Sequence, residues 1–484
     1  MSLRKKILLL ITISVLSFGC FEDNDDNGAY ASEINDFVWK GMNAAYLYKQ
    51  EIFDLSNNRF DNSDQYANYL NEYDSPESIF ESLIHDRDNI DKFSIIVNDY
   101  VELEQYLSGN IISNGMEFGL SFVPNSSSEI FGFVRYVHPN SQADLNNIKR
   151  GDIFNSINDT QLTINNYSNL LSEETYLINF ADYNDNGTEE INDDSISSNN
   201  LNIEIQKLPL IKNPVYHHSI INSANGKIGY IMYNQFVSNY DEYLESIFSE
   251  FKSNSIDDVI LDLRYNPGGS INSAILLSSL ITGQFENEIF NTEQWNTEIQ
   301  NYWIENDPEY LINRFISIEN SLSMNRVFVL TTRSSASASE LIINCLNPYI
   351  NVIQIGTTTY GKYQASVTLY DSENFSKQNI NPSHNYALQP LVLKTLNVNG
   401  VTDYFDGINP DYEFEERPSN MGEIGDLDEP MLNFTLELIN SRNHTKNSPE
   451  AIGLIGDNFN FEYLDKRMHI NKTPLKLSHE NKLW

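Results

Sequence analysis

A serine and a lysine with the potential to act as a catalytic pair stand 25 positions apart in residues 331–362. Ser337 lies within the small-residue run SSASAS, and Lys362 follows a Tyr-Gly turn. A serine hydroxyl is a poor nucleophile at neutral pH, so it needs a neighbouring base. A lysine amine can be that base where burial keeps it neutral. The two residues therefore predict a Ser-Lys dyad that works through an acyl-enzyme.

Acyl transfer also requires hydrogen-bond donors for the oxyanion that develops on the substrate. Ala338 follows the serine directly, where a predicted helix begins and leaves backbone N–H groups free. Gly268 and Gly269 lie in the sequence NPGG after a predicted strand, where the loop can present a backbone N–H as the second donor. We expect oxyanion donors from these positions, and no metal or cofactor.

Alternating strands and helices should position these groups. Buried apolar strands that alternate with amphipathic helices predict an α/β layer with parallel pairing, whose site lies beyond the strand C-termini. Both the NPGG and SSASAS segments directly follow strands, so they should converge at one edge of a mixed sheet. The predicted strands are 227–236, 257–266, 326–332 and 351–356, and the predicted helices are 240–251, 270–280 and 336–346.

Five stretches carry a family resemblance: IGYI, ILDLRYNPGGS, SSASASEL, IGTTTYGK and FDGINPD. Through them, residues 215–415 resemble the catalytic domain of the C-terminal processing (tail-specific) serine peptidases. The resemblance implies that Ser337 is the nucleophile and Lys362 the general base. It also implies oxyanion donors from the backbones of Ala338 and of Gly268 or Gly269.

One position departs from the family pattern, which often has a glutamine four residues after the lysine to orient its amine. Here that position is Ser366, and Gln364 stands two residues earlier. Either side chain could hold Lys362. Glu340 is interpreted as a charge that favours the N-terminus of a helix, rather than as a catalyst.

Residues 108–210 have short strands bounded by turn residues, which predicts a β-rich domain. It resembles a protease-associated PDZ domain through Pro139, Ser141, Ala143, Lys149, Gly151, Asp152, Ile157 and Asn158. In such a domain Phe118, Gly119 and Leu120 would form the loop that captures a peptide C-terminus. The alternative is a module that only gates or scaffolds the enzyme.

The N-terminus predicts export. A basic start and an apolar run too short to span a bilayer make residues 1–19 a signal peptide. Cys20 follows Gly19 as in the lipobox of bacterial lipoproteins, which implies lipidation, a membrane anchor and a cell-envelope location at the periplasmic face or the cell surface. Residues 20–30 form an acidic tether. The alternative is an ordinary signal peptide with a chance cysteine. Cys345 is the only other cysteine in the sequence, so we expect no intrachain disulfide.

The remaining segments carry less chemistry. Residues 31–107 show helical periodicity, with Ser75 and Pro76 beginning one helix, and packing is their expected role. Residues 182–194 partly match a calcium loop but lack its final glutamate, so a solvated acidic loop is favoured. Residues 211–420 form the predicted catalytic domain, and residues 421–484 follow it as a C-terminal segment.

The whole chain has a formal net charge of −38, which argues against nucleic acid as a partner. We expect an endopeptidase that cleaves unfolded or tail-exposed proteins. Alternatives are a catalytically silent peptide-binding envelope lipoprotein of the same fold, an esterase or general peptide-degrading enzyme, and a Ser-His-Asp mechanism using His217 or His218. The oligomeric state does not follow from the sequence.

Overall fold

The structure is a computed structural model that describes residues 32–188, 190–440, 468–470 and 472. Its central element is a six-stranded sheet in the order β10-β11-β12-β16-β17-β22. The last five strands run parallel, as predicted, and β10 is antiparallel to β11. The strands are β10 (Val215–Ser223), β11 (Gly226–Tyr233), β12 (Asp258–Asp262), β16 (Arg326–Thr331), β17 (Asn351–Gly356) and β22 (Tyr412–Glu413).

Three helices connect and cover these strands: α8 (Asp241–Ser253), α9 (Ile271–Thr282) and α11 (Ala338–Leu346). Every residue of β12 and of α11 is buried, and the apolar side chains of all three helices share one core with the sheet. Burial of each large apolar side chain contributes about 1.5–3 kcal/mol, so the packing of these helices on the sheet is strongly stabilising. Because α9 and α11 follow parallel strands of this sheet, both helices begin at the edge where those strands end.

A second six-stranded sheet lies beside the first, in the order β13-β23-β18-β21-β14-β15. It contains the residues that follow Gly268 and those that follow Lys362, with a C-terminal strand between them. Its strands are β13 (Gly269–Ser270), β23 (Met468–His469), β18 (Gln364–Ser366), β21 (Leu391–Leu396), β14 (Ile289–Trp295) and β15 (Ile312–Arg314), and α10 (Thr297–Asn306) follows β14.

The N-terminal helices are α2 (Glu33–Ala45), α3 (Ser63–Leu70), α4 (Pro76–Ser82) and α5 (Tyr100–Leu107). Ser75 caps α4 and Pro76 begins it, which confirms that prediction. The region is not separate from the α/β layer, because Trp39 and Tyr46 belong to the same core. In addition, β1 (Ile95–Val97) pairs with β20 (Ala387–Gln389), which pairs with β19 (Leu369–Tyr370).

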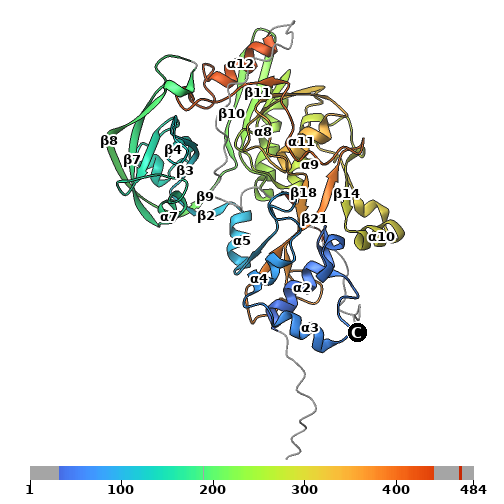
Figure 1. Ribbon diagram of the computed structural model, residues 1–484. Helices are drawn as coiled ribbons and strands as arrows, with labels where there is room; N and C mark the ends of the chain where they lie inside the picture. Colours follow the sequence, from blue (N-terminus) through green and yellow to red (C-terminus); the bar gives the residue numbers. More distant parts are fainter. Residues whose placement is uncertain (1–31, 189, 441–467, 471, 473–484) are drawn as a thin grey trace, which may run out of the picture.

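A β-rich module has a core of its own and lies to one side of the α/β layer, while the N-terminal helices lie below it in the view of Figure 1. Of the predicted acidic loop, residues 182–184 end β7, which pairs antiparallel with β8 of this module. The module comprises β3 (Met116–Phe122), β4 (Ile130–Val137), β5 (Ile153–Ile157), β6 (Thr160–Gln161), β7 (Thr175–Asn184), β8 (Ser195–Gln206), α6 (Gln142–Leu145) and α7 (Tyr167–Ser172). The antiparallel pair β2 (Asn110–Ser113) and β9 (Leu208–Ile211) joins it to the rest of the chain.

The chain continues from the α/β layer into α12 (Pro430–Asn440). The expected signal peptide, Cys20 and the whole acidic tether of residues 20–30 lie outside the described residues. Within the part of the chain that the structure covers, no helix has both the length and the apolar character needed to cross a membrane.

Candidate active site

Ser337 occupies the turn between β16 and α11, where it is the residue that precedes the helix. Its backbone has φ 65° and ψ −113°, a conformation that costs a residue with a Cβ about 1–3 kcal/mol. The side chain is fully buried, and its Oγ has no hydrogen-bond partner among the described residues. Strain of this kind persists where the surroundings impose it, and it is frequent at reactive residues.

Gly268 packs directly against Ser337. A Cβ at this glycine would lie 2.5 Å from Ser337 Cβ and 3.0 Å from Ala338 N, so only glycine fits. The structure therefore brings the NPGG and SSASAS segments together, as the sheet topology predicts. Ala338 is the first residue of α11, and its N–H has no partner within the helix.

Asn266 holds the NPGG loop in place. Its Oδ1 accepts a hydrogen bond from Gly268 N at 2.9 Å, and its backbone oxygen accepts one from Ala336 N at 3.0 Å. Gly269 lies in β13, with strand neighbours on both sides. Among the predicted oxyanion donors, the N–H of Ala338 is next to the serine and makes no hydrogen bond within its helix. The N–H of Gly268 instead donates to Asn266.

Lys362 is fully buried, and its Nζ lies 4.6 Å from the centroid of the Phe93 ring. Ser337 Oγ has no hydrogen-bond partner in the described part of the chain, so it makes no hydrogen bond to this amine in the present conformation. Phe93 belongs to the N-terminal region, for which only packing was expected. That region therefore forms part of the surroundings of the lysine.

Glu340 joins the two halves of the predicted dyad. Its Oε2 accepts hydrogen bonds from Ser337 N at 2.7 Å and Lys362 N at 2.8 Å. Its Oε1 accepts from Gly361 N and from Thr359 Oγ1, each at 2.6 Å. Burial raises the pKa of this carboxyl to about 7, although the four hydrogen bonds act in the opposite direction.

The predicted role of Glu340, a charge at a helix N-terminus, describes only part of these contacts. Ser337 and Glu340 have the spacing of a capping box, in which the third residue of a helix bonds back to the residue before it. That pattern was available in the sequence. The bonds to Gly361 and Lys362 were not, because they cross between segments that meet only in the fold.

Gln364 and Ser366 both lie in β18 and are buried. Gln364 Nε2 donates to the hydroxyl of Tyr48 at 3.0 Å, and its Oε1 has no hydrogen-bond partner among the described residues. The backbone oxygen of Ser366 accepts a bond from Ile470 N at 3.2 Å. Which of the two side chains orients the lysine remains a prediction.

A cavity of about 320 Å³ lies between the β-rich module and the α/β layer. Phe118 lines it, together with Met116 and Tyr176 from the module and Pro267 and Ser334 from the α/β layer. Gly119 and Leu120 pair with β4 inside the sheet, and Leu120 is buried in the module core. Of the predicted loop Phe118, Gly119 and Leu120, only Phe118 lines the cavity, and the residues before it, Met116 and Glu117, line it as well.

The other candidate residues lie in separate surroundings. His217 packs against Gly425, and its Nε2 has no hydrogen-bond partner in the described chain. His218 lies 3.5 Å from a carboxylate oxygen of Glu250. In the predicted acidic loop, Asp182 accepts from Asn199. Cys345 is a buried free thiol, and the described residues contain no cluster of three groups that could hold a metal ion.

Two family profiles match the chain: Peptidase family S41 over residues 227–414 and the Peptidase S41 N-terminal domain over residues 33–95. The first range contains Ser337, Lys362 and the NPGG loop. The second contains Tyr48 and Phe93. Together the two ranges make up more than half of the chain, which therefore belongs to peptidase family S41.

Curated relatives agree with this assignment. A carboxyl-terminal-processing protease from Picosynechococcus is 26% identical over 33% of this chain and 35% of its own length. Carboxyl-terminal-processing peptidase 3 from Arabidopsis thaliana is 24% identical over 32% of this chain and 28% of its own length. The chain thus spans about a third of the length of the curated relatives it matches.

Solved structures show the same fold over most of the chain. A protein from Bacteroides fragilis described as an S41 protease aligns with a TM-score of 0.63 and 24% identity, covering 85% of this chain and 98% of its own. The photosystem II D1 C-terminal processing protease aligns with a TM-score of 0.52 and 15% identity over the same shares.

Proposed function

We propose that the protein is a serine endopeptidase in which Ser337 and Lys362 form the catalytic dyad. The observation that carries this proposal is the strained backbone of Ser337, packed on Gly268 and tied through Glu340 to the backbone of Lys362. Membership of family S41 supports the class of reaction.

In the proposed reaction, Lys362 Nζ accepts the hydroxyl proton as Ser337 Oγ attacks the substrate carbonyl. The N–H of Ala338 donates to the oxyanion, and Gly268 N–H can join it once it leaves Asn266. The C–N bond then breaks, and the departing amine takes the proton from the lysine. Water then hydrolyses the acyl ester, after the neutral amine of Lys362 has accepted a proton from it.

Since Ser337 Oγ and the lysine are not hydrogen-bonded here, this scheme requires a local rearrangement that closes the dyad. Catalytic hydrogen bonds are often long before substrate binds. Because the backbones of both residues are already fixed to Glu340, we expect the side chains rather than the backbones to move.

We further propose that the β-rich module is PDZ-like and binds the C-termini of unfolded or tail-exposed proteins in the cavity next to Phe118. An extended peptide could add to β3 there by backbone hydrogen bonds. A lipid on Cys20 would hold the enzyme at the envelope. Metabolic labelling with a radioactive fatty acid should mark the wild type and leave Cys20→Ala unlabelled, and equal labelling would exclude this anchor.

The central test compares the wild type with Ser337→Ala and Lys362→Ala on an unfolded protein substrate. We expect both variants to lose at least a hundredfold in kcat/KM while retaining the thermal stability of the parent. Trapping of uncut substrate by Ser337→Ala would add support. Equal residual activity in all three proteins would exclude the dyad, and binding without cleavage by the wild type would favour the silent peptide-binding alternative.

A further inference from the structure

Residues 468–470 cross the candidate active site as an extended strand. Strand β23 pairs in parallel with β13 through Gly269 and Met468, and with β18 through Ser366 and His469. Strand β13 begins directly after Gly268, which touches Ser337, and β18 begins two residues after Lys362. The segment therefore lies between the nucleophile side and the base side of the dyad, in the manner of a peptide bound by strand addition.

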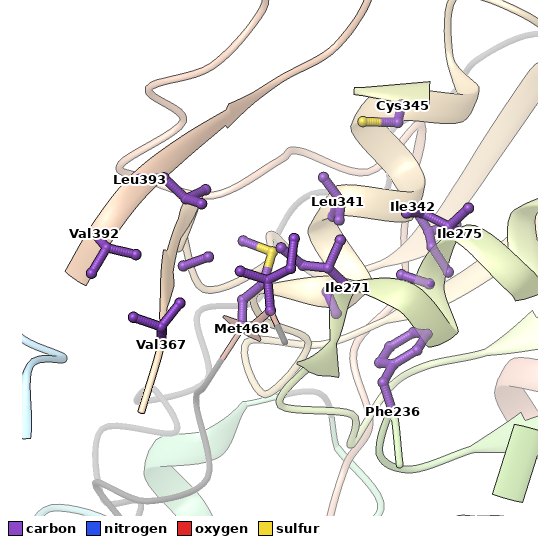
Figure 2. Close-up of a cluster of buried hydrophobic side chains, with 14 of the residues drawn as sticks. Phe236, Ile271, Ile275, Leu341, Ile342, Cys345, Val367, Val392, Leu393 and Met468 are labelled. Carbon is purple, nitrogen blue, oxygen red and sulfur yellow. The ribbon is translucent and has the colours of Figure 1, made fainter. Parts of the chain in front are cut away.

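The side chains of this segment occupy defined positions. Met468 is fully buried, and Figure 2 shows it beside Ile271 at the start of α9 and Leu341 in α11. Ile470 is 4% exposed and belongs to the same core. Alternate residues of a strand face the same side, so this side of the slot accepts two apolar side chains separated by one residue.

Lys472 completes the pattern. Its Nζ lies 2.8 Å from Glu293 Oε1 and 2.8 Å from the backbone oxygen of Tyr310, and 4.9 Å from the centroid of the Tyr310 ring. The side chain of Glu293 is fully buried, and among the described residues it also accepts hydrogen bonds from the neutral side chains of Trp295 and Asn313. A buried carboxylate without a cation is strongly destabilising. The site around Glu293 is therefore built to receive a basic side chain.

We propose that residues 468–470 and Lys472 occupy the substrate groove as an internal competitor, and that Glu293 makes this groove selective for extended peptides with a basic residue four positions after the apolar residue in the Met468 site. This inference rests on the proposed function, because the groove is defined by the Ser337–Lys362 dyad. The strand also lies in place while Ser337 Oγ makes no hydrogen bond to any residue that the structure describes, as expected of a resting enzyme.

The test uses the full chain with wild type, Lys472→Gln, Lys472→Glu and the charge exchange Glu293→Lys with Lys472→Glu. We expect the two single variants to cleave unfolded casein at least fivefold faster than the wild type. The charge exchange restores an ion pair between positions 293 and 472, so it should lower the rate below that of Lys472→Glu. Equal rates in all four active proteins, with Ser337→Ala inactive, would overturn the inference and leave the proposed function standing.

A competitor peptide of residues 466–474 tests the selectivity. It should inhibit Lys472→Glu at least tenfold more strongly than the same peptide with glutamate at the position of Lys472. Equal inhibition by the two peptides would overturn the role of Glu293.

Hydrogen exchange provides a measurement that does not depend on activity. The Ile470 amide should exchange slowly in the wild type and at least tenfold faster in Lys472→Glu. Rapid exchange of this amide in the wild type would overturn the inference whether or not the protein cleaves peptides.

Discussion

At the scale of single residues, Glu340 fixes the relative positions of nucleophile and base. Each of its carboxylate oxygens accepts two hydrogen bonds, and together these reach the backbones of Ser337, Gly361 and Lys362. Without them, several buried N–H groups would be left unsatisfied, at about 1–3 kcal/mol each. We interpret Glu340 as a positioning residue, since its contacts are to the backbones of the dyad and to Thr359.

The raised pKa of Glu340 predicts a pH dependence of stability. Its ordinary pKa of 4.5 rises to about 7 in the fold, so between these values the folded state binds more protons than the unfolded state. The free energy of unfolding should therefore fall as pH rises from 4.5 through 7, by about 3 kcal/mol.

Denaturant titrations of wild type and Glu340→Gln at several pH values measure this contribution. The difference in unfolding free energy between the two proteins should change by that amount across the window. A constant difference from pH 4.5 to 8 would contradict the prediction.

Glu340→Gln should also show a lower kcat with a similar KM. The reason is that the new amide NH₂ would face the backbone N–H groups that now donate to the carboxylate.

At the scale of elements, an ion cluster joins the end of β12 to the loop before α12. Arg264 is fully buried and contacts the carboxylates of Asp262, Glu416 and Glu429. Burial would raise the pKa of Glu416, but Arg150 and Arg264 outweigh it and hold that pKa at about 2. The cluster therefore holds the segment that leads into NPGG against the C-terminal part of the α/β layer.

Replacing Arg264 with methionine should leave these buried carboxylates without their cation and lower the free energy of unfolding by about 3–5 kcal/mol. Urea unfolding at pH 7 measures this loss. The matched control is Arg314→Met, which removes a more exposed pair with Glu309 and should cost at most about 1 kcal/mol. Similar losses in the two variants would contradict a structural role for the cluster.

At the scale of the whole molecule, the β-rich module reaches the α/β layer close to the nucleophile. Arg135 Nη1 of the module donates to Ser334 Oγ at 3.0 Å, three residues before Ser337. The cavity at this junction is lined from both sides, by Phe118 and by Pro267 of the NPGG loop. A peptide bound there would contact both the module and the segment that supports the oxyanion donors.

This arrangement predicts that peptides with a free C-terminal carboxylate bind Ser337→Ala at least tenfold more tightly than their amidated forms. Phe118→Ala should weaken binding by at least fivefold, because it removes an aromatic wall of the cavity. Phe53→Ala, at an exposed phenylalanine, is the control and should bind as its parent does. Titration calorimetry measures each affinity, and equal binding of free and amidated peptides would favour a module that only gates or scaffolds.

The sequence by itself determined the alternation of strands and helices in the α/β layer and the residues of the predicted dyad. The physical reason is that buried parallel strands and amphipathic helices have distinct local periodicities, which residues 227–356 show clearly. The position of NPGG and SSASAS after their strands was enough to predict that the two segments converge at one edge of the sheet, and the contact between Gly268 and Ser337 agrees with this.

Only the tertiary structure decided which distant segments complete the site. Phe93 and Tyr48 reach it from the N-terminal region, Glu340 bonds to the backbone of Lys362, and Met468 fills the slot between β13 and β18. These contacts join segments separated by between 22 and more than 300 positions. Such partners depend on how the layers pack and on where buried polar groups find hydrogen bonds, which local sequence patterns do not encode.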